Sequence, residues 1–329
     1  MLKKKWTEQG YIDEPADEGT DLKREIRRMC EEKDAIILAH YYTISEIQEI
    51  ADFVGDSLAL ARRAAETDAR VMVMCGVHFM AETCKLLCPD RTVLCPDLNA
   101  GCSLADSCRA EDLKRMKEEH PGYQVISYVN TTAAVKALTD VVVTSGNAKR
   151  IVDQLPEDAN LIFGPDYNLG NYINGVTGRK MVLWKGGCHV HERFSAAKIA
   201  ELKGQYPEAV VMAHLECKGP VLALADVKGS TAEMLRYAQE SEKNVFIVAT
   251  EAGILHELRR RCGGKVFIPV PPEISESGLE CSCNECGYMK MNTLLKVYNT
   301  LKYGWPTVEI DPETAREAVK PIYRMLEMS

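Results

Sequence analysis

The segment IILAHYY at residues 36–42 decides the fold, because it returns as VISYVN at 125–130 and as VVMAHLE at 210–216. In each copy a short apolar run leads to a ring-bearing side chain. The three copies align on these residues: His40, Tyr128 and His214. They stand 88 and 86 residues apart, and a shared period of this length predicts a triplicated structural unit.

The three copies also match beyond these segments. Two residues after the alignment point stand Tyr42, Asn130 and Glu216. Twelve residues after it each copy has an aspartate: Asp52, Asp140 and Asp226. Seventeen residues after it each copy has a hydroxyl: Ser57, Ser145 and Thr231. Polar residues at matching places in three copies predict one site assembled between them.

The composition is that of a globular protein, since 46% of the 329 residues are hydrophobic and 27% are charged. A net charge of −8 argues against a nucleic-acid partner, because phosphate backbones demand clustered Lys and Arg. No run approaches the roughly 20 apolar residues that span a bilayer, and the N-terminus lacks the apolar core of a signal peptide. We therefore expect a cytoplasmic protein with no membrane partner.

Amphipathic helices alternate with short apolar runs in every copy. The first strands are expected at the three segments above, the second at 71–74, 161–164 and 245–250, and the third at 92–97, 181–186 and 266–271. This alternation is typical of parallel sheets covered on both faces. The predicted fold class is α/β, with three similar small α/β/α units around a pseudo-threefold axis and the active site at the centre. The expected units are 1–108, 109–194 and 195–329, the last with a C-terminal helical extension.

Thirteen cysteines, an odd number, indicate metal or redox chemistry rather than a disulfide framework. Each copy has a cysteine beyond its third strand: Cys102 in NAGCSLAD, Cys188 in KGGCHVHERF, and Cys281, Cys283 and Cys286 in CSCNECGYMKMN. One thiolate from each copy would leave a metal, or one iron of a cluster, with an open position for a Lewis-acid role. A zinc site is the alternative, with Cys283 and Cys286 joined by Cys84, Cys88 and Cys95.

Polar groups beyond the carboxyl ends of parallel strands face the ligand crevice. Ser57, Ser145 and Thr231 lie where a loop meets a helix, a position suited to carboxylate or phosphate. An ordinary helix N-cap is the alternative for each of them. Glu216, His214 and His191 are candidates for general acid and base, and Tyr42 and Tyr128 for closing over a ligand or donating a hydroxyl. Phosphate loops of the GxGxxG and GxxxxGK[ST] types are absent from the sequence.

The chain resembles the quinolinate synthases over nearly its whole length. The resemblance lies in LAHYY, IADFVGDSLAL, CGVHFMAET, NAGCSLAD, YVNTTAAVKALTD, GPDYNLG, WKGGCHVHERF, AHLEC, GST and CGYMKMNTL. It implies three α/β domains around a 4Fe-4S cluster with one open iron, held by Cys102, Cys188 and Cys286. It also implies a transferase of NAD biosynthesis that condenses iminoaspartate with dihydroxyacetone phosphate, releasing phosphate and two waters. An iminoaspartate-producing enzyme is the expected functional partner.

The resemblance also implies roles for single residues. The cavity would be lined by His40, Tyr128, Asn130, His191 and His214. Carboxylate or phosphate oxygens would be bound by Ser57, Ser145 and Thr231. Glu216 would be the acid–base residue, and Tyr42 would be a lid over the substrate. The last cysteine loop departs from the CxxCxxC of many relatives, because Cys281 is one residue off register. A redox sensor or scaffold without catalysis is the second functional hypothesis.

Overall fold

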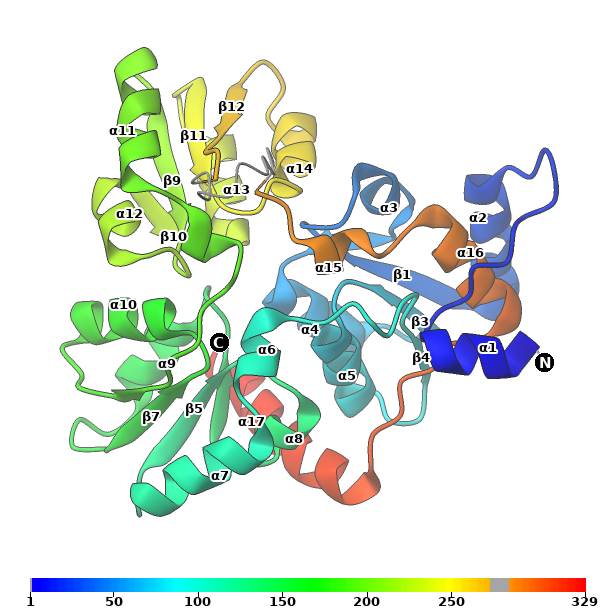
Figure 1. Cartoon of the computed structure of the whole chain (residues 1–329), viewed down its shortest axis with the longest axis horizontal. Coiled ribbons are helices and arrows are strands. Elements are labelled where there is room, and N and C mark those ends of the chain that lie inside the picture. The colour runs from blue at the N-terminus through cyan, green and yellow to red at the C-terminus, as the bar shows by residue number, and fades with distance from the viewer. Residues whose placement is uncertain (1, 273–283) are drawn as a thin grey trace.

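The computed structural model describes residues 2–272 and 284–329, and in this part of the chain three four-stranded parallel sheets are arranged about a common centre (Figure 1). All three sheets follow one strand order. The unit's first strand lies between its second and third strands, and the fourth lies beyond the third. This shared order confirms the predicted architecture of three similar α/β/α units.

The first sheet has the order β2-β1-β3-β4 and consists of β1 (Ala35–His40), β2 (Phe53–Gly55), β3 (Val71–Cys75) and β4 (Thr92–Leu94). Its helices are α1 (Leu2–Gln9), α2 (Leu22–Lys33), α3 (Ser45–Ile50), α4 (Ser57–Glu66), α5 (His78–Leu87) and α6 (Ser103–Ser107). Alternate strand residues point to opposite faces. Ile36 and Leu38 therefore pack with residues of α4 and α5, whereas Ile37 and Ala39 pack with residues of α2 and α3.

The second sheet has the order β6-β5-β7-β8: β5 (Gln124–Tyr128), β6 (Val141–Val143), β7 (Leu161–Gly164) and β8 (Val182–Leu183). Its helices are α7 (Ala110–Glu119), α8 (Ala133–Lys136), α9 (Ala148–Gln154) and α10 (Tyr167–Thr177), followed by the 3₁₀ turn His191–Arg193. The third sheet, β10-β9-β11-β12, contains β9 (Val210–His214), β10 (Val227–Gly229), β11 (Val245–Ala249) and β12 (Val266–Pro269). Its helices are α11 (Ala196–Gln205), α12 (Gly219–Leu224), α13 (Thr231–Glu240) and α14 (Ile254–Arg261).

Each sheet has one strand more than the sequence analysis predicts. The additional strands, β2, β6 and β10, are three residues long, too short to show a hydrophobic period. Each follows directly on the repeated aspartate. Asp52, Asp140 and Asp226 accept hydrogen bonds from the backbone N–H of Ile37, Val125 and Val211 at 2.7, 2.7 and 2.8 Å. The aspartate is therefore repeated because it starts the edge strand.

The C-terminal segment returns to the first two units. It contains α15 (Gly287–Lys290), α16 (Leu294–Tyr303) and α17 (Pro312–Met328). Helix α16 packs on α2, and Thr307 forms an antiparallel bridge with Leu94. Helix α17 packs against β6 and α8 of the second unit (Figure 1). The expected boundaries after residues 108 and 194 stay predictions. None of the described helices is both long and apolar enough to cross a bilayer.

Replacing Asp140 by Ala should lower the free energy of unfolding by about 1–3 kcal/mol, because the Val125 N–H loses a charged hydrogen-bond acceptor. The measurement is chemical denaturation followed by circular dichroism. Asp158→Ala, at an exposed position of the same unit, is the control and should leave the stability unchanged. Equal stabilities of the two variants would show that the aspartate does not hold the edge strand.

Candidate active site

A cavity with an empty volume of about 690 Å³ lies where the carboxyl ends of the central strands β1, β5 and β9 meet. The structure brings all the sequence-predicted site residues to its walls: His40, Tyr42, Ser57, Cys102, Tyr128, Asn130, Ser145, Cys188, His191, His214, Glu216, Thr231 and Cys286. Their chemical roles stay predictions.

The two strand-end histidines have the same local geometry. Nδ1 of His40 accepts the backbone N–H of Tyr42 at 3.2 Å, and Nδ1 of His214 accepts that of Glu216 at 3.3 Å. Burial lowers the pKa of His40 to about 3 and that of His214 to about 4. Both rings are therefore neutral near pH 7, with the proton on Nε2 because Nδ1 is an acceptor.

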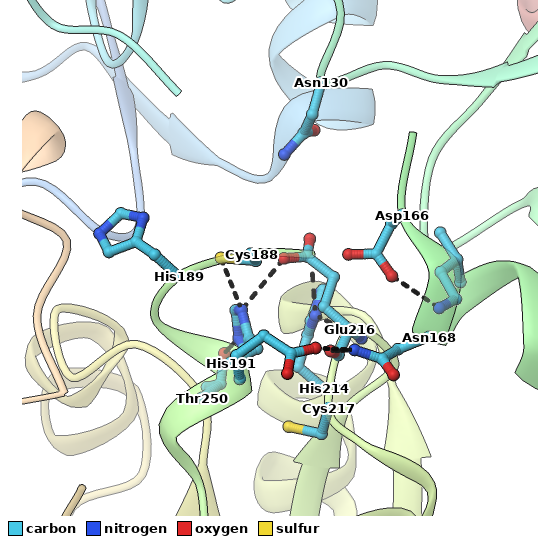
Figure 2. Close-up of polar contacts among 12 residues, drawn as sticks. Asn130, Asp166, Asn168, Cys188, His189, His191, His214, Glu216, Cys217 and Thr250 are labelled. Atoms are coloured by element: carbon cyan, nitrogen blue, oxygen red, sulfur yellow. Dashed lines mark hydrogen bonds and ion pairs between the residues drawn. The ribbon is translucent and has the colours of Figure 1, made fainter. Parts of the chain in front are cut away.

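Glu216 is buried and is held by partners from the second unit (Figure 2). The Tyr128 hydroxyl donates to Oε1 at 2.5 Å, and His191 Nδ1 lies 3.0 Å from Oε2. Burial by itself would raise the pKa of Glu216, but the nearby His191 and His214 and the hydrogen bonds from His191 and Tyr128 hold it below its usual range. Glu216 is thus an ionised carboxylate at neutral pH. Burial and Glu216 raise the pKa of Tyr128, so its phenol keeps its proton.

The network continues from His191 to the first unit. His191 Nε2 lies 2.9 Å from Thr250 Oγ1, and Thr250 Oγ1 lies 2.6 Å from the Tyr42 hydroxyl. The path from Glu216 through His191 and Thr250 to Tyr42 therefore joins the three sheets. Such a chain can pass a proton between its ends without moving the backbone.

Three of the described cysteines are partly exposed, namely Cys102, Cys188 and Cys286. The other described cysteines are buried. Cys102 is the N-cap of α6, Cys286 is the N-cap of α15, and Cys188 precedes the 3₁₀ turn. Burial raises the pKa of Cys102 to about 12, against the hydrogen bonds of the Ala105 and Leu104 backbone. A bound cation would reverse this and hold the thiolates. Cys281 and Cys283 lie outside the described residues.

Only one of these three cysteines belongs to a close group of possible metal ligands in the described residues. A zinc ion binds sulfur at about 2.3 Å, so its ligand sulfurs lie no more than about 4.6 Å apart. Within the described ranges, the only group of three or more Cys, His, Asp or Glu side chains that comes near this spacing is Cys188, His191 and Glu216, whose ligand atoms lie within 4.8 Å of one another. Cys102 and Cys286 lie outside that group but on the same cavity.

Three cysteines of the zinc alternative lie away from Cys286 and the cavity. Cys84, Cys88 and Cys95 belong to the apolar core of the first unit and do not line the cavity. The Cys88 thiol donates to the Ala64 carbonyl at 3.1 Å, and the Cys95 thiol to the Asp97 carbonyl at 3.4 Å. Burial raises the pKa of Cys84 well above its usual value and that of Cys95 to about 12, as expected of packed thiols.

Ser57 and Thr231 are the first residues of α4 and α13, whereas Ser145 lies in the turn before α9, and the helix caps come from other residues. Asp56 caps α4 and accepts from the Ala59 N–H at 2.9 Å, and Ser230 caps α13 in a capping box with Glu233. Within 2–272 and 284–329, the hydroxyls of Ser57, Ser145 and Thr231 make no hydrogen bond. They are therefore available to a ligand in the cavity.

Three buried residues at the site were missed by the sequence analysis. Thr250 follows β11, which the sequence analysis expects as the second strand of its copy. A systematic look at the ends of these strands would have found it. Asp166 is fully buried, and its Oδ2 has no partner among the described residues; burial and Glu216 raise its pKa. Figure 2 shows this oxygen on the side of Glu216. Glu251 accepts the Cys286 N–H at 2.9 Å and pairs with Lys290 at 2.8 Å. No pattern in a single sequence marks such an interior pair.

Known proteins resemble this chain over almost all of its length. The family model described as "Quinolinate synthetase A protein" matches residues 24–327. A quinolinate synthase of Thermosynechococcus vestitus is 52% identical over 309 residues, which cover 94% of this chain and 96% of the relative. Those of Rippkaea orientalis and Chloroherpeton thalassium are 50% and 49% identical over 309 residues, covering 94% of this chain and 94% and 95% of the relatives.

The neutral histidines predict that the fold weakens in mild acid. In the unfolded chain, histidines bind protons below their pKa of about 6.5. In the folded chain, His40 and His214 stay unprotonated down to their pKa values near 3 and 4. The free energy of unfolding should therefore fall as the pH is lowered from 6.5 toward 4. Urea denaturation at several pH values measures this. The double variant His40→Asn, His214→Asn should show a flatter dependence; an equal slope would contradict the assignment.

Proposed function

The chain belongs to the quinolinate synthase family, and we propose that it condenses iminoaspartate with dihydroxyacetone phosphate to quinolinate. Phosphate and two waters are released, and the product serves NAD biosynthesis. The observation that carries this proposal is the meeting of one cysteine from each unit with the buried Glu216 network on one cavity. The family relationship supports this condensation reaction. The cavity supports it because it brings together possible metal ligands and a buried carboxylate.

In this proposal Cys102, Cys188 and Cys286 hold a 4Fe-4S cluster. The cluster would supply an iron without a fourth protein ligand, a Lewis acid toward a substrate oxygen. Asn130 supports the placement, because its amide Nδ2 lies 4.0 Å from Cys102 Sγ while its Oδ1 has no partner in the described chain. An exposed cluster and many free thiols fit a reducing compartment, which supports the cytoplasm.

Both substrates are anionic, and the cavity offers donors for them. The hydroxyls of Ser57 and Thr231 stand in the first turns of α4 and α13, where the backbone dipole favours a carboxylate or phosphate. Ser145 adds a third hydroxyl from the second unit. Neutral His40 and His214 present Nε2–H groups, which donate to carbonyl or hydroxyl oxygens without adding charge. Iminoaspartate hydrolyses in water, so we propose that an iminoaspartate-producing enzyme acts together with this one.

Glu216 is the proposed general base, because it is ionised and buried in the cavity wall. Ring formation requires protons to leave carbon and to reach departing oxygens, and Glu216 can serve both needs. The path through His191 and Thr250 can carry the proton onward to Tyr42. The Tyr128 hydroxyl keeps the carboxylate in place. A redox sensor would not need a buried carboxylate, histidines and hydroxyls that meet on one cavity, so the catalytic hypothesis is favoured.

Iron analysis tests the ligand set. Anaerobically purified protein should contain about four irons and four sulfides per chain, and serine at Cys102, Cys188 or Cys286 should remove most of them. Alanine at Cys84 or Cys95, in the core of the first unit, should not change the iron content. A colourless protein that binds zinc, or iron loss in the core variants alone, would refute the assignment.

Glu216→Gln should lower kcat by roughly 10²–10⁴-fold, the usual contribution of a general base, with the iron content unchanged. Quinolinate formation from the two substrates is the assay. Glu192→Gln is the matched control, because Glu192 lies close by and receives the Asn168 amide at 2.5 Å but does not line the cavity. Full activity of Glu216→Gln with its iron retained would show that another residue moves the proton.

A further inference from the structure

Lys136 ends helix α8 and is completely buried. Its ammonium donates to the carbonyl of Val129 at 2.9 Å and to the carbonyl of Thr131. These two carbonyls flank Asn130, which lines the cavity and whose amide points to Cys102. Lys136 therefore fixes the backbone on both sides of a cavity residue.

The first unit makes the same arrangement with a neutral side chain. Gln48 follows His40 by eight residues, as Lys136 follows Tyr128. Its amide donates to the carbonyls of Tyr41 and Thr43 at 2.9 and 2.8 Å, and these flank Tyr42. An uncharged amide thus suffices for the two hydrogen bonds. The positive charge of Lys136 needs a separate explanation.

A buried ammonium without an ion pair is costly, far more so than a buried amide. The nearby Glu82 carboxylate accepts the Ala133 N–H at 3.0 Å and forms no ion pair with Lys136 in the described part of the chain. Burial lowers the pKa of Lys136 to about 8, while the charges of Glu82 and Cys102 oppose this, so the amine is mostly protonated at pH 7. The ammonium lies 5.4 Å from the centre of the Phe79 ring, which also lines the cavity.

We propose that Lys136 is a positioning residue whose positive charge balances the anionic group that Cys102 helps to hold. The inference rests on the proposed cluster. Three thiolates give a cluster a net negative charge, and reduction adds one more. A cation fixed behind the cavity wall stabilises the reduced form and raises the reduction potential. The second unit has a lysine where the first has a glutamine because Lys136 lies behind a ligand cysteine.

The experiment separates the charge from the hydrogen bonds. Lys136→Gln installs the residue that the first unit uses and removes only the charge. Lys136→Arg keeps the charge. Gln48→Met removes the corresponding hydrogen bonds from the first unit without changing charge, and Lys117→Gln removes a half-buried cation that donates to the Leu138 carbonyl in the second unit. Iron and sulfide content come first, then the midpoint potential from an anaerobic titration followed by absorbance and EPR.

We expect Lys136→Gln to keep its iron and to shift the midpoint potential to more negative values. Gln48→Met and Lys117→Gln should keep the wild-type potential, as should Lys136→Arg. If Lys136→Gln loses its iron while Lys136→Arg retains it, the charge is also supported. A wild-type potential in Lys136→Gln, or equal iron loss in the Gln and Arg variants, would overturn the inference alone. A wild-type chain without iron would overturn the proposed function as well.

Discussion

The site depends on one geometric constraint: the carboxyl ends of three parallel sheets must face a common cavity. Parallel strands deliver every strand end to the same edge of a sheet, so each unit offers one edge with polar groups. Glu216 shows why all three edges are needed. Its carboxylate is buried, and it is kept ionised by Tyr128 and His191 from another unit, with Thr250 and Tyr42 completing the network. A unit folded alone would leave these groups without partners, at a cost that favours assembly of the whole.

The three units use one backbone plan for different chemistry. At the strand end stand two neutral histidines and a tyrosine, and two residues later stand a tyrosine, an amide and a carboxylate. Only one of these six side chains is charged at neutral pH, namely Glu216. Burying a single carboxylate among neutral donors satisfies its oxygens without bringing a second buried charge into contact. Triplication therefore supplied the positions, and divergence distributed the functions.

Much of this plan could be predicted from the sequence, because matching positions in three copies act as an internal comparison. The repeat located the strand-end residues, the hydroxyls, Cys102 and Cys188, the family resemblance selected Cys286, and the structure gathers all of them around one cavity. The edge strands β2, β6 and β10 were missed because three residues carry no period. Asp166 and Glu251 were missed for another reason: only packing shows that Asp166 is buried near Glu216 and that Glu251 meets Cys286.

The return of α16 and α17 makes the first two units depend on segments that follow the third unit in the sequence. Val297 and Leu301 of α16 fill the core beside α2, and Ala318, Ile322 and Met325 of α17 enter the core of the second unit. The apolar surfaces that these helices cover in the first two units stay exposed until α16 and α17 have been synthesised. The third unit therefore lies in the sequence between the first two units and the helices that complete their cores. Loss of only the final helix would therefore damage units made long before it.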